Sequence, residues 1–131
     1  MQWMISHVPE NNIILITSTG EISVKQFKQI LHEALVLGQH HNSDLYLVDH
    51  RNVHTSIGVL DVLDLIKHMD EMDFPKRSRI AKVITKDDSD ICRFLETVSL
   101  NRGFQLRIFD YIEAAKTWLT TKKLPLISFS T

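Results

Sequence analysis

The sequence predicts one α/β domain: a mixed, mostly parallel sheet of about five strands with an N-terminal β-hairpin and about four helices. Short apolar runs of strand length alternate along the chain with longer segments whose apolar residues recur at helical intervals. Repeated strand-helix-strand units of this kind pair in parallel through right-handed crossovers. The chain has 131 residues, of which 44% are hydrophobic and 24% charged, and these values fit a single folded domain over residues 1–131.

The first two strands are predicted to form the hairpin. Met1–Val8 alternates partly between polar and bulky apolar residues, and Ile13–Thr17 is a β-branched apolar run. The turn cluster Pro9–Asn12 separates them. The continuous apolar character of the second run indicates a strand that is covered on both faces.

The first helix has the clearest start signal. Ser23 and Gln26 have the spacing of a capping box, and Ile22 and Phe27 can form the hydrophobic staple around it. Gly38 is predicted to end the helix. The apolar stripe follows at helical intervals: Phe27, Ile30, Leu31, Ala34 and Leu35.

A central strand and a second helix come next. Leu45–Val48 is a short apolar run that ends at Asp49, and an irregular stretch separates it from a helix predicted over Val59–Met72. Pro75 stops this helix. The stripe expected to face the sheet consists of Val59, Leu63, Ile66 and Met69.

A further strand over Ile80–Ile84 precedes a third helix, which ends at Gly103. Negative charge favours a helix start, and the acidic residues that mark this one are Asp87, Asp88 and Asp90.

The last strand is predicted over Leu106–Phe109. Asp110 and Glu113 repeat the capping-box spacing before a fourth helix, with Asp110 as the cap. We expect the core of the domain to cover about residues 10–120, and the apolar tail, residues 122–131, to form an edge strand or a docked arm.

Composition excludes several function classes. The net charge of −1 offers no general attraction to nucleic acid or to acidic membrane surfaces. The apolar runs are far shorter than a membrane span, and no targeting segment is evident. The single cysteine, Cys92, cannot form an internal disulfide and fits a reducing compartment. We therefore expect a cytoplasmic protein without nucleic-acid partners.

Four motifs carry a resemblance to a known family. They are a Gly-containing turn before the first helix, a strand that ends in Asp, a strand of I-A-x-V character, and a closing strand and helix of the form R-x-F-D…A…W-L. In this chain they are Thr19–Glu21, Leu47–Asp49, Ile80–Val83 and Arg107–Asp110, followed by Ala114 or Ala115 and Trp118–Leu119. Together with the order of elements, they resemble the SpoIIAA-like family, which has the STAS fold of anti-sigma-factor antagonists. The resemblance implies a non-catalytic regulatory or protein-interaction domain.

The family's phosphorylation sequence is altered in this chain. True antagonists carry a phosphorylatable Ser in an Asp-Ser-Ser-Gly sequence at the start of the helix after the Asp-ending strand. His54–Gly58 stands near that place, but His replaces the Asp and an extra residue separates Ser56 from Gly58. Phosphorylation of Thr55 or Ser56 is therefore one alternative for this loop.

The polar stretch from Asp49 to Ser56 is the candidate site, because ligands of open α/β sheets bind beyond the carboxyl ends of the strands. Three interpretations stay open. The stretch is an ordinary polar loop with a helix cap at Thr55 or Ser56, a site for an anion, ligand or phosphate, or a metal site. The candidate ligand or interaction residues are Asp49, His50, Arg51, His54, Thr55, Ser56 and Gly58.

No motif of an enzyme is present. The seven histidines are dispersed without metal-ligand spacing, and the sequence has no phosphate-binding loop and no dinucleotide fingerprint. We accordingly predict no catalytic residue, no metal and no cofactor, and the sequence favours a non-enzyme.

Three functions compete. The first is a regulatory domain that binds a protein partner. The second, implied by the fold similarity of the family to Sec14-type domains, is a carrier of a small apolar molecule or lipid, held between the sheet and Leu60, Leu63, Met69 and Met72 of the second helix. The third is a metal-dependent enzyme that uses Asp49, His50 and His54. Trp3 and the apolar tail also favour a homodimer.

Overall fold

The computed structural model describes residues 2–85 and 89–121. Within them, one sheet has the strand order β1-β2-β3-β4-β5, in which β1 and β2 pair antiparallel and all other neighbours pair in parallel. The strands are β1 (Trp3–Val8), β2 (Ile13–Glu21), β3 (Leu45–His54), β4 (Arg79–Val83) and β5 (Gln105–Phe109). The helices are α1 (Val24–His40), α2 (Val59–Glu71), α3 (Ser89–Asn101) and α4 (Ile112–Thr120). The mixed sheet, the N-terminal hairpin and the four helices confirm the predicted fold.

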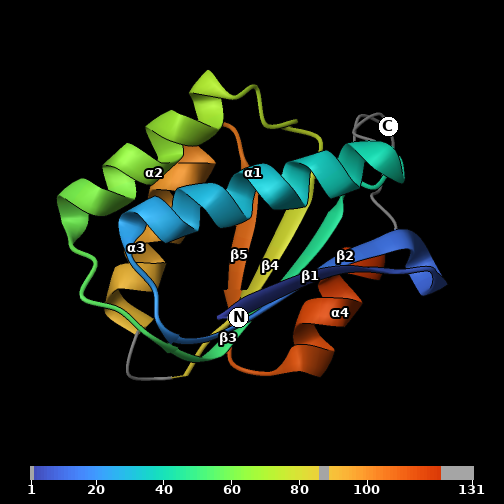
Figure 1. The fold of residues 1–131 in the computed structure, drawn as a ribbon, viewed down its shortest axis with the longest axis horizontal. Coiled ribbons are helices and arrows are strands. Elements are labelled where there is room, and N and C mark those ends of the chain that lie inside the picture. The colour runs from blue at the N-terminus through green and yellow to red at the C-terminus, as the bar shows by residue number, and fades with distance from the viewer. Residues whose placement is uncertain (1, 86–88, 122–131) are drawn as a thin grey trace, which may run out of the picture.

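The sheet lies between two unequal layers of helices. Helices α1, α2 and α3 gather on one face, and α4 lies apart from them on the other (Figure 1). Successive strand residues alternate between the two cores, since Ile14 belongs to the larger core under α1–α3 and Ile13 to the smaller core under α4. The prediction that β2 is covered on both faces is thereby confirmed.

The start of α1 is as predicted, but its end is not. Ser23 is the N-cap, and its side chain and that of Gln26 each accept a hydrogen bond from the other's backbone N–H. Gly38 does not end the helix, which continues to His40. The residue is a glycine because the ring of Tyr46 on β3 lies where a Cβ would stand.

The predicted inward stripe of α2 is confirmed at Ile66 and Met69 and wrong at Val59 and Leu63. The side chains that face the core are Val62, Leu65, Ile66 and Met69. Val59 and Leu63, expected to be inside, are 52% and 40% exposed. The apolar residues of α2 occupy more than one face, so spacing alone permits two stripes.

Two further predictions concern the C-terminal part. The N-cap of α4 is Tyr111 and makes no side-chain capping bond, so the predicted cap at Asp110 is wrong. Residues 122–131, Asp87 and Asp88 lie outside the described residues. Among the helices of the described part, none is long and apolar enough to cross a membrane.

Candidate functional site

The strand that carries the candidate site is longer than predicted. β3 does not end at Asp49 but continues to His54, so most of the stretch expected to be a loop is sheet. Against β2, Thr17 pairs with Asp49 and Thr19 with Asn52, which leaves one extra residue in β3. This β-bulge changes which residues face the helices, because the alternation of the strand shifts there.

Asp49 and Arg51 form a self-contained ion pair. Arg51 Nε donates to Asp49 Oδ1 at 2.9 Å, and Arg51 Nη2 donates to Oδ2 at 2.8 Å. These hydrogen bonds from Arg51 hold the pKa of the Asp49 carboxyl below its usual range. The carboxylate therefore has its bidentate partner within the same strand.

His50 points the other way, into the larger core. It is only 4% exposed, and neither Nδ1 nor Nε2 has a hydrogen-bond partner among the described residues. Burial, reinforced by the positive charge of Lys82, lowers the pKa of His50 well below its usual value. Burial of the neutral imidazole without hydrogen bonds to its two nitrogens costs about 1–3 kcal/mol of folding free energy.

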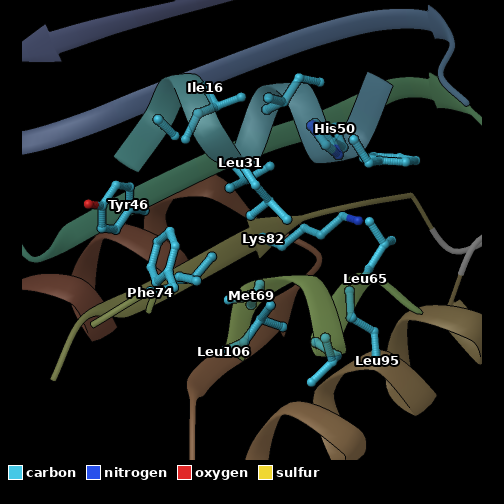
Figure 2. Close-up of a pocket in the computed structure, with 16 residues that line it drawn as sticks. Ile16, Leu31, Tyr46, His50, Leu65, Met69, Phe74, Lys82, Leu95 and Leu106 are labelled. Carbon is cyan, nitrogen blue, oxygen red and sulfur yellow. The ribbon is translucent and has the colours of Figure 1, made fainter. Parts of the chain in front are cut away.

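A small cavity lies beside His50, between the sheet and α1–α2. Its volume is about 80 Å³, and its walls are almost wholly apolar. Figure 2 shows His50 and Lys82 extending from the sheet into the space that Leu31 and Leu65 border from the helices. The walls include one cation, because Lys82 is a half-buried residue whose Nζ lies 5.3 Å from the centre of the Phe27 ring.

A second, smaller hollow of about 40 Å³ adjoins the first. It shares Phe27, Leu65, Lys82 and Leu95 with the larger cavity and extends to Thr55, Ile57 and Cys92. Lys82 thus lies between two apolar spaces near the carboxyl ends of β3 and β4. In the sequence, Lys82 belongs to a small basic cluster with Lys76, Arg77 and Arg79, for which a solvated loop is expected, but the alternation Ile80-Lys82-Ile84 places it on the inward face of β4.

The loop after β3 contains two hydroxyl side chains, of which that of Thr55 is hydrogen-bonded to the backbone and that of Ser56 is exposed. Thr55 Oγ1 donates to the Ile22 carbonyl at 3.3 Å and accepts from the Ile57 N–H at 3.2 Å. Ser56 is exposed. The N-cap of α2 is Gly58, whose N–H donates to Asp61 Oδ2 at 3.0 Å, so the predicted cap at Thr55 or Ser56 is wrong.

An apolar patch adjoins this loop. Val59, Leu60 and Leu63 of α2 are 52%, 80% and 40% exposed, and their spacing places them together on the helix surface. We call them the α2 patch. Of the apolar ligand face predicted on α2, Met69 lines the cavity, whereas the prediction is wrong for Leu60 and Leu63, whose side chains face outward.

Comparison with known proteins identifies the fold. No family description and no curated protein matches the chain by sequence. An anti-sigma factor antagonist from Mycobacterium paratuberculosis is similar in structure, with a TM-score of 0.61, 13% identity and coverage of 91% of this chain and 93% of that one. An uncharacterised protein with a SpoIIAA-like fold from Shewanella loihica PV-4 has a TM-score of 0.56, 14% identity and coverage of 89% and 91%. The chain has the SpoIIAA-like fold.

Unphosphorylated SpoIIAA itself superposes with a TM-score of 0.49 at 14% identity, over 91% of this chain and 99% of that one. The Mycobacterium and Shewanella structures confirm the predicted resemblance at the level of fold. In this SpoIIAA-like domain, the candidate site lies where β3 leads into α2.

The residues expected for a metal site are not brought together. His50 is buried on the α1–α3 side, whereas Asp49 pairs with Arg51 and His54 is exposed. Across residues 2–85 and 89–121, no three His, Cys, Asp or Glu side chains are grouped so that they could hold a metal ion.

The structure instead gathers three histidines that the sequence analysis described as dispersed. The rings of His7 and His41 stack at 3.7 Å between centroids, and His40 meets His41 edge-on at 4.9 Å. Only pairing of β1 with β2 beside the end of α1 produces this contact, so no spacing in the sequence signals it.

Proposed function

We propose that this domain is a non-catalytic regulatory module that binds a protein partner through the loop Thr55–Gly58 and the α2 patch. The observation that carries the proposal is the exposure of Val59, Leu60 and Leu63 next to a polar loop at the carboxyl end of the sheet. The Mycobacterium neighbour of the same fold is an anti-sigma factor antagonist, a name that describes action on another protein.

The energetics favour an apolar partner surface. Complete burial of an exposed Leu or Val side chain contributes about 1.5–3 kcal/mol, and the three residues of the α2 patch start from 40–80% exposure. The charged neighbour Asp64 already forms an ion pair with Lys28 Nζ at 2.7 Å. A partner can therefore cover the patch without leaving the Asp64 carboxylate unpaired at its edge.

Ser56 is the residue of this loop that we propose as the modification site. Its side chain is exposed, whereas the Thr55 hydroxyl is engaged with backbone groups of Ile22 and Ile57. A phosphate on Ser56 would add negative charge within two residues of the N-cap Gly58 and beside the α2 patch, and so change the binding of a partner there.

The test is site-specific cross-linking in the cells from which the protein comes. A photo-reactive residue at Ser56 is expected to capture one protein, and Leu60→Asp is expected to lower its yield at least tenfold. Leu100→Asp on α3, where the leucine is 68% exposed, is the matched control and is expected to change nothing.

An equal loss of cross-linking yield in the Leu60→Asp and Leu100→Asp variants would show that capture is non-specific and would contradict the proposal. Intact-mass measurement of the same native protein tests the modification, for which one added phosphate on Ser56 is expected. A homodimer remains part of the proposal, and sedimentation at several concentrations tests it.

A further inference from the structure

Two polar groups lie in an apolar cavity and have no polar partner in the described part of the chain. His50 is 4% exposed with both ring nitrogens unpaired, and no described carboxylate pairs with the ammonium of Lys82. Within the described part of the chain, that ammonium lies over the face of the Phe27 ring, 5.3 Å from its centre. Buried polar groups are normally satisfied, so the two open ring nitrogens of His50 beside a cavity indicate a ligand with complementary polar atoms, and the half-buried Lys82 adds a cation to the same wall.

The two groups are positioned to act on one ligand. Lys82 pairs in register with Val48, and His50 follows two residues later on the same strand and the same face. Figure 2 shows both side chains extending from β3 and β4 into the cavity. Lys82 offers a positive charge, and the neutral imidazole of His50 offers one N–H donor and one acceptor.

The volume limits the size of the ligand. A dry apolar cavity of about 150 Å³ accommodates benzene, which has six carbon atoms. The 80 Å³ here corresponds to a shorter chain, and the adjoining hollow of about 40 Å³ on the other side of Lys82 adds a little room. A long-chain lipid does not fit.

We propose that this cavity binds a short-chain carboxylate of roughly three to five carbon atoms. Its carboxylate lies between the Lys82 ammonium and the His50 N–H, and its hydrocarbon end contacts Leu31, Leu65 and Met69. Lys82 is only half-buried, and the ligand enters past it. The site is distinct from the α2 patch and does not depend on the proposed partner.

The test is titration of the full-length, isotope-labelled protein with isovalerate, followed by amide NMR shifts. We expect saturable shifts at the backbone of Val48, His50 and Leu65, with a dissociation constant on the order of 0.1–1 mM because so small a ligand makes few contacts. Isovaleramide, which has the same shape without the charge, is expected to bind at least tenfold more weakly.

Two variants test the contribution of the Lys82 charge and that of the cavity space separately. Lys82→Met is expected to weaken isovalerate binding at least tenfold, whereas Lys67→Met, at an exposed lysine of α2, leaves it unchanged. Ala34→Leu on α1 fills the cavity and is expected to abolish binding without loss of fold.

Three results would overturn the proposal. They are equal binding of acid and amide, unchanged binding by Lys82→Met, and absence of any saturable shift up to roughly 20 mM isovalerate, a concentration far above the expected range. The last result would mean that water alone satisfies His50.

Discussion

Tyr46 on β3 occupies the space that a side chain at position 38 of α1 would need. A Cβ built on Gly38 would lie 2.8 Å from Tyr46 Cζ and closer still to the phenol oxygen. Tyr46 is itself 2% exposed and packs against Phe74, with 5.2 Å between ring centroids. Close approach of α1 to the sheet therefore requires glycine at this position.

Gly38→Ala is expected to lower the free energy of unfolding by about 1–3 kcal/mol, because the methyl group displaces a well-packed ring. Urea denaturation measures it. Tyr46→Leu in the same chain should recover part of the loss, as expected for two contacting residues. Gly58→Ser is the control, because nothing lies within 4 Å of a Cβ there and a serine N-cap adds a few tenths of a kcal/mol. Equal loss at both glycines would contradict the explanation.

His50 makes stability depend on pH. The pKa of His50 in the folded chain lies well below its value of about 6.5 in the unfolded chain. As the pH falls below 6.5, His50 therefore becomes protonated in the unfolded chain but stays neutral in the folded chain. Stability is full above that value and decreases below it. From pH 7.5 to 5.5, protonation of His50 in the unfolded chain should lower the free energy of unfolding by at most about 1.4 kcal/mol. The groups that act on it are Lys82, which lowers the pKa, and Asp49, which raises it.

Chemical denaturation at both pH values checks this expectation. His50→Leu should remove that share of the pH dependence, whereas His54→Gln, at an exposed histidine, should keep it. If the wild type and His50→Leu lose equal stability between pH 7.5 and 5.5, His50 is not the responsible group.

Arg79 holds α4 to the sheet. It is 8% exposed, and its Nη1 donates to the carbonyls of Trp118 and Thr121, at 2.7 Å each. Both carbonyls lie at the C-terminal end of α4, where a cation is favourable. Arg79→Met should lower the free energy of unfolding by about 2–4 kcal/mol, because two charge-assisted bonds are lost and two carbonyls lose their donor.

Amide hydrogen exchange should then show early opening of α4 before the rest of the domain. The control is Arg77→Met, where the arginine is largely exposed and pairs with Asp44 at 3.1 Å. It should cost less than about 1 kcal/mol, as surface ion pairs do. Uniform protection across α4 in the Arg79→Met protein would mean that packing of Ala115 and Leu119 alone holds the helix.

Elements with strong local signals were predictable from the sequence. The Ser23–Gln26 capping box and the β-branched run of β2 each have one physical interpretation, and both are confirmed. The register of α2 and the end of α1 were not predictable, because they depend on partners far along the chain. Gly38 resembles a helix terminator unless the position of Tyr46 is known.

The candidate site stays a prediction, and the structure changes its setting. The strand was expected to end at Asp49 but continues to His54, because the β-bulge that extends it has no sequence signature. Lys82 follows Lys76 and Arg77 in a basic cluster that is typical of a solvated loop. The alternation of β4 turns its side chain inward, and the pairing of β4 with β3 brings it beside His50, which the sequence does not reveal.

The strand order carries a kinetic consequence. Each strand after β1 pairs with the strand that precedes it along the chain. Every new pairing therefore closes a loop that contains only the segment between two successive strands. Three of the four pairings are parallel and span a helical crossover, so the domain is expected to fold more slowly than a helical bundle, although no pairing spans more than one crossover. Among the five described strands, none has to be inserted between two strands that formed earlier. The sheet can therefore grow from β1 towards β5 while the chain is still being synthesised.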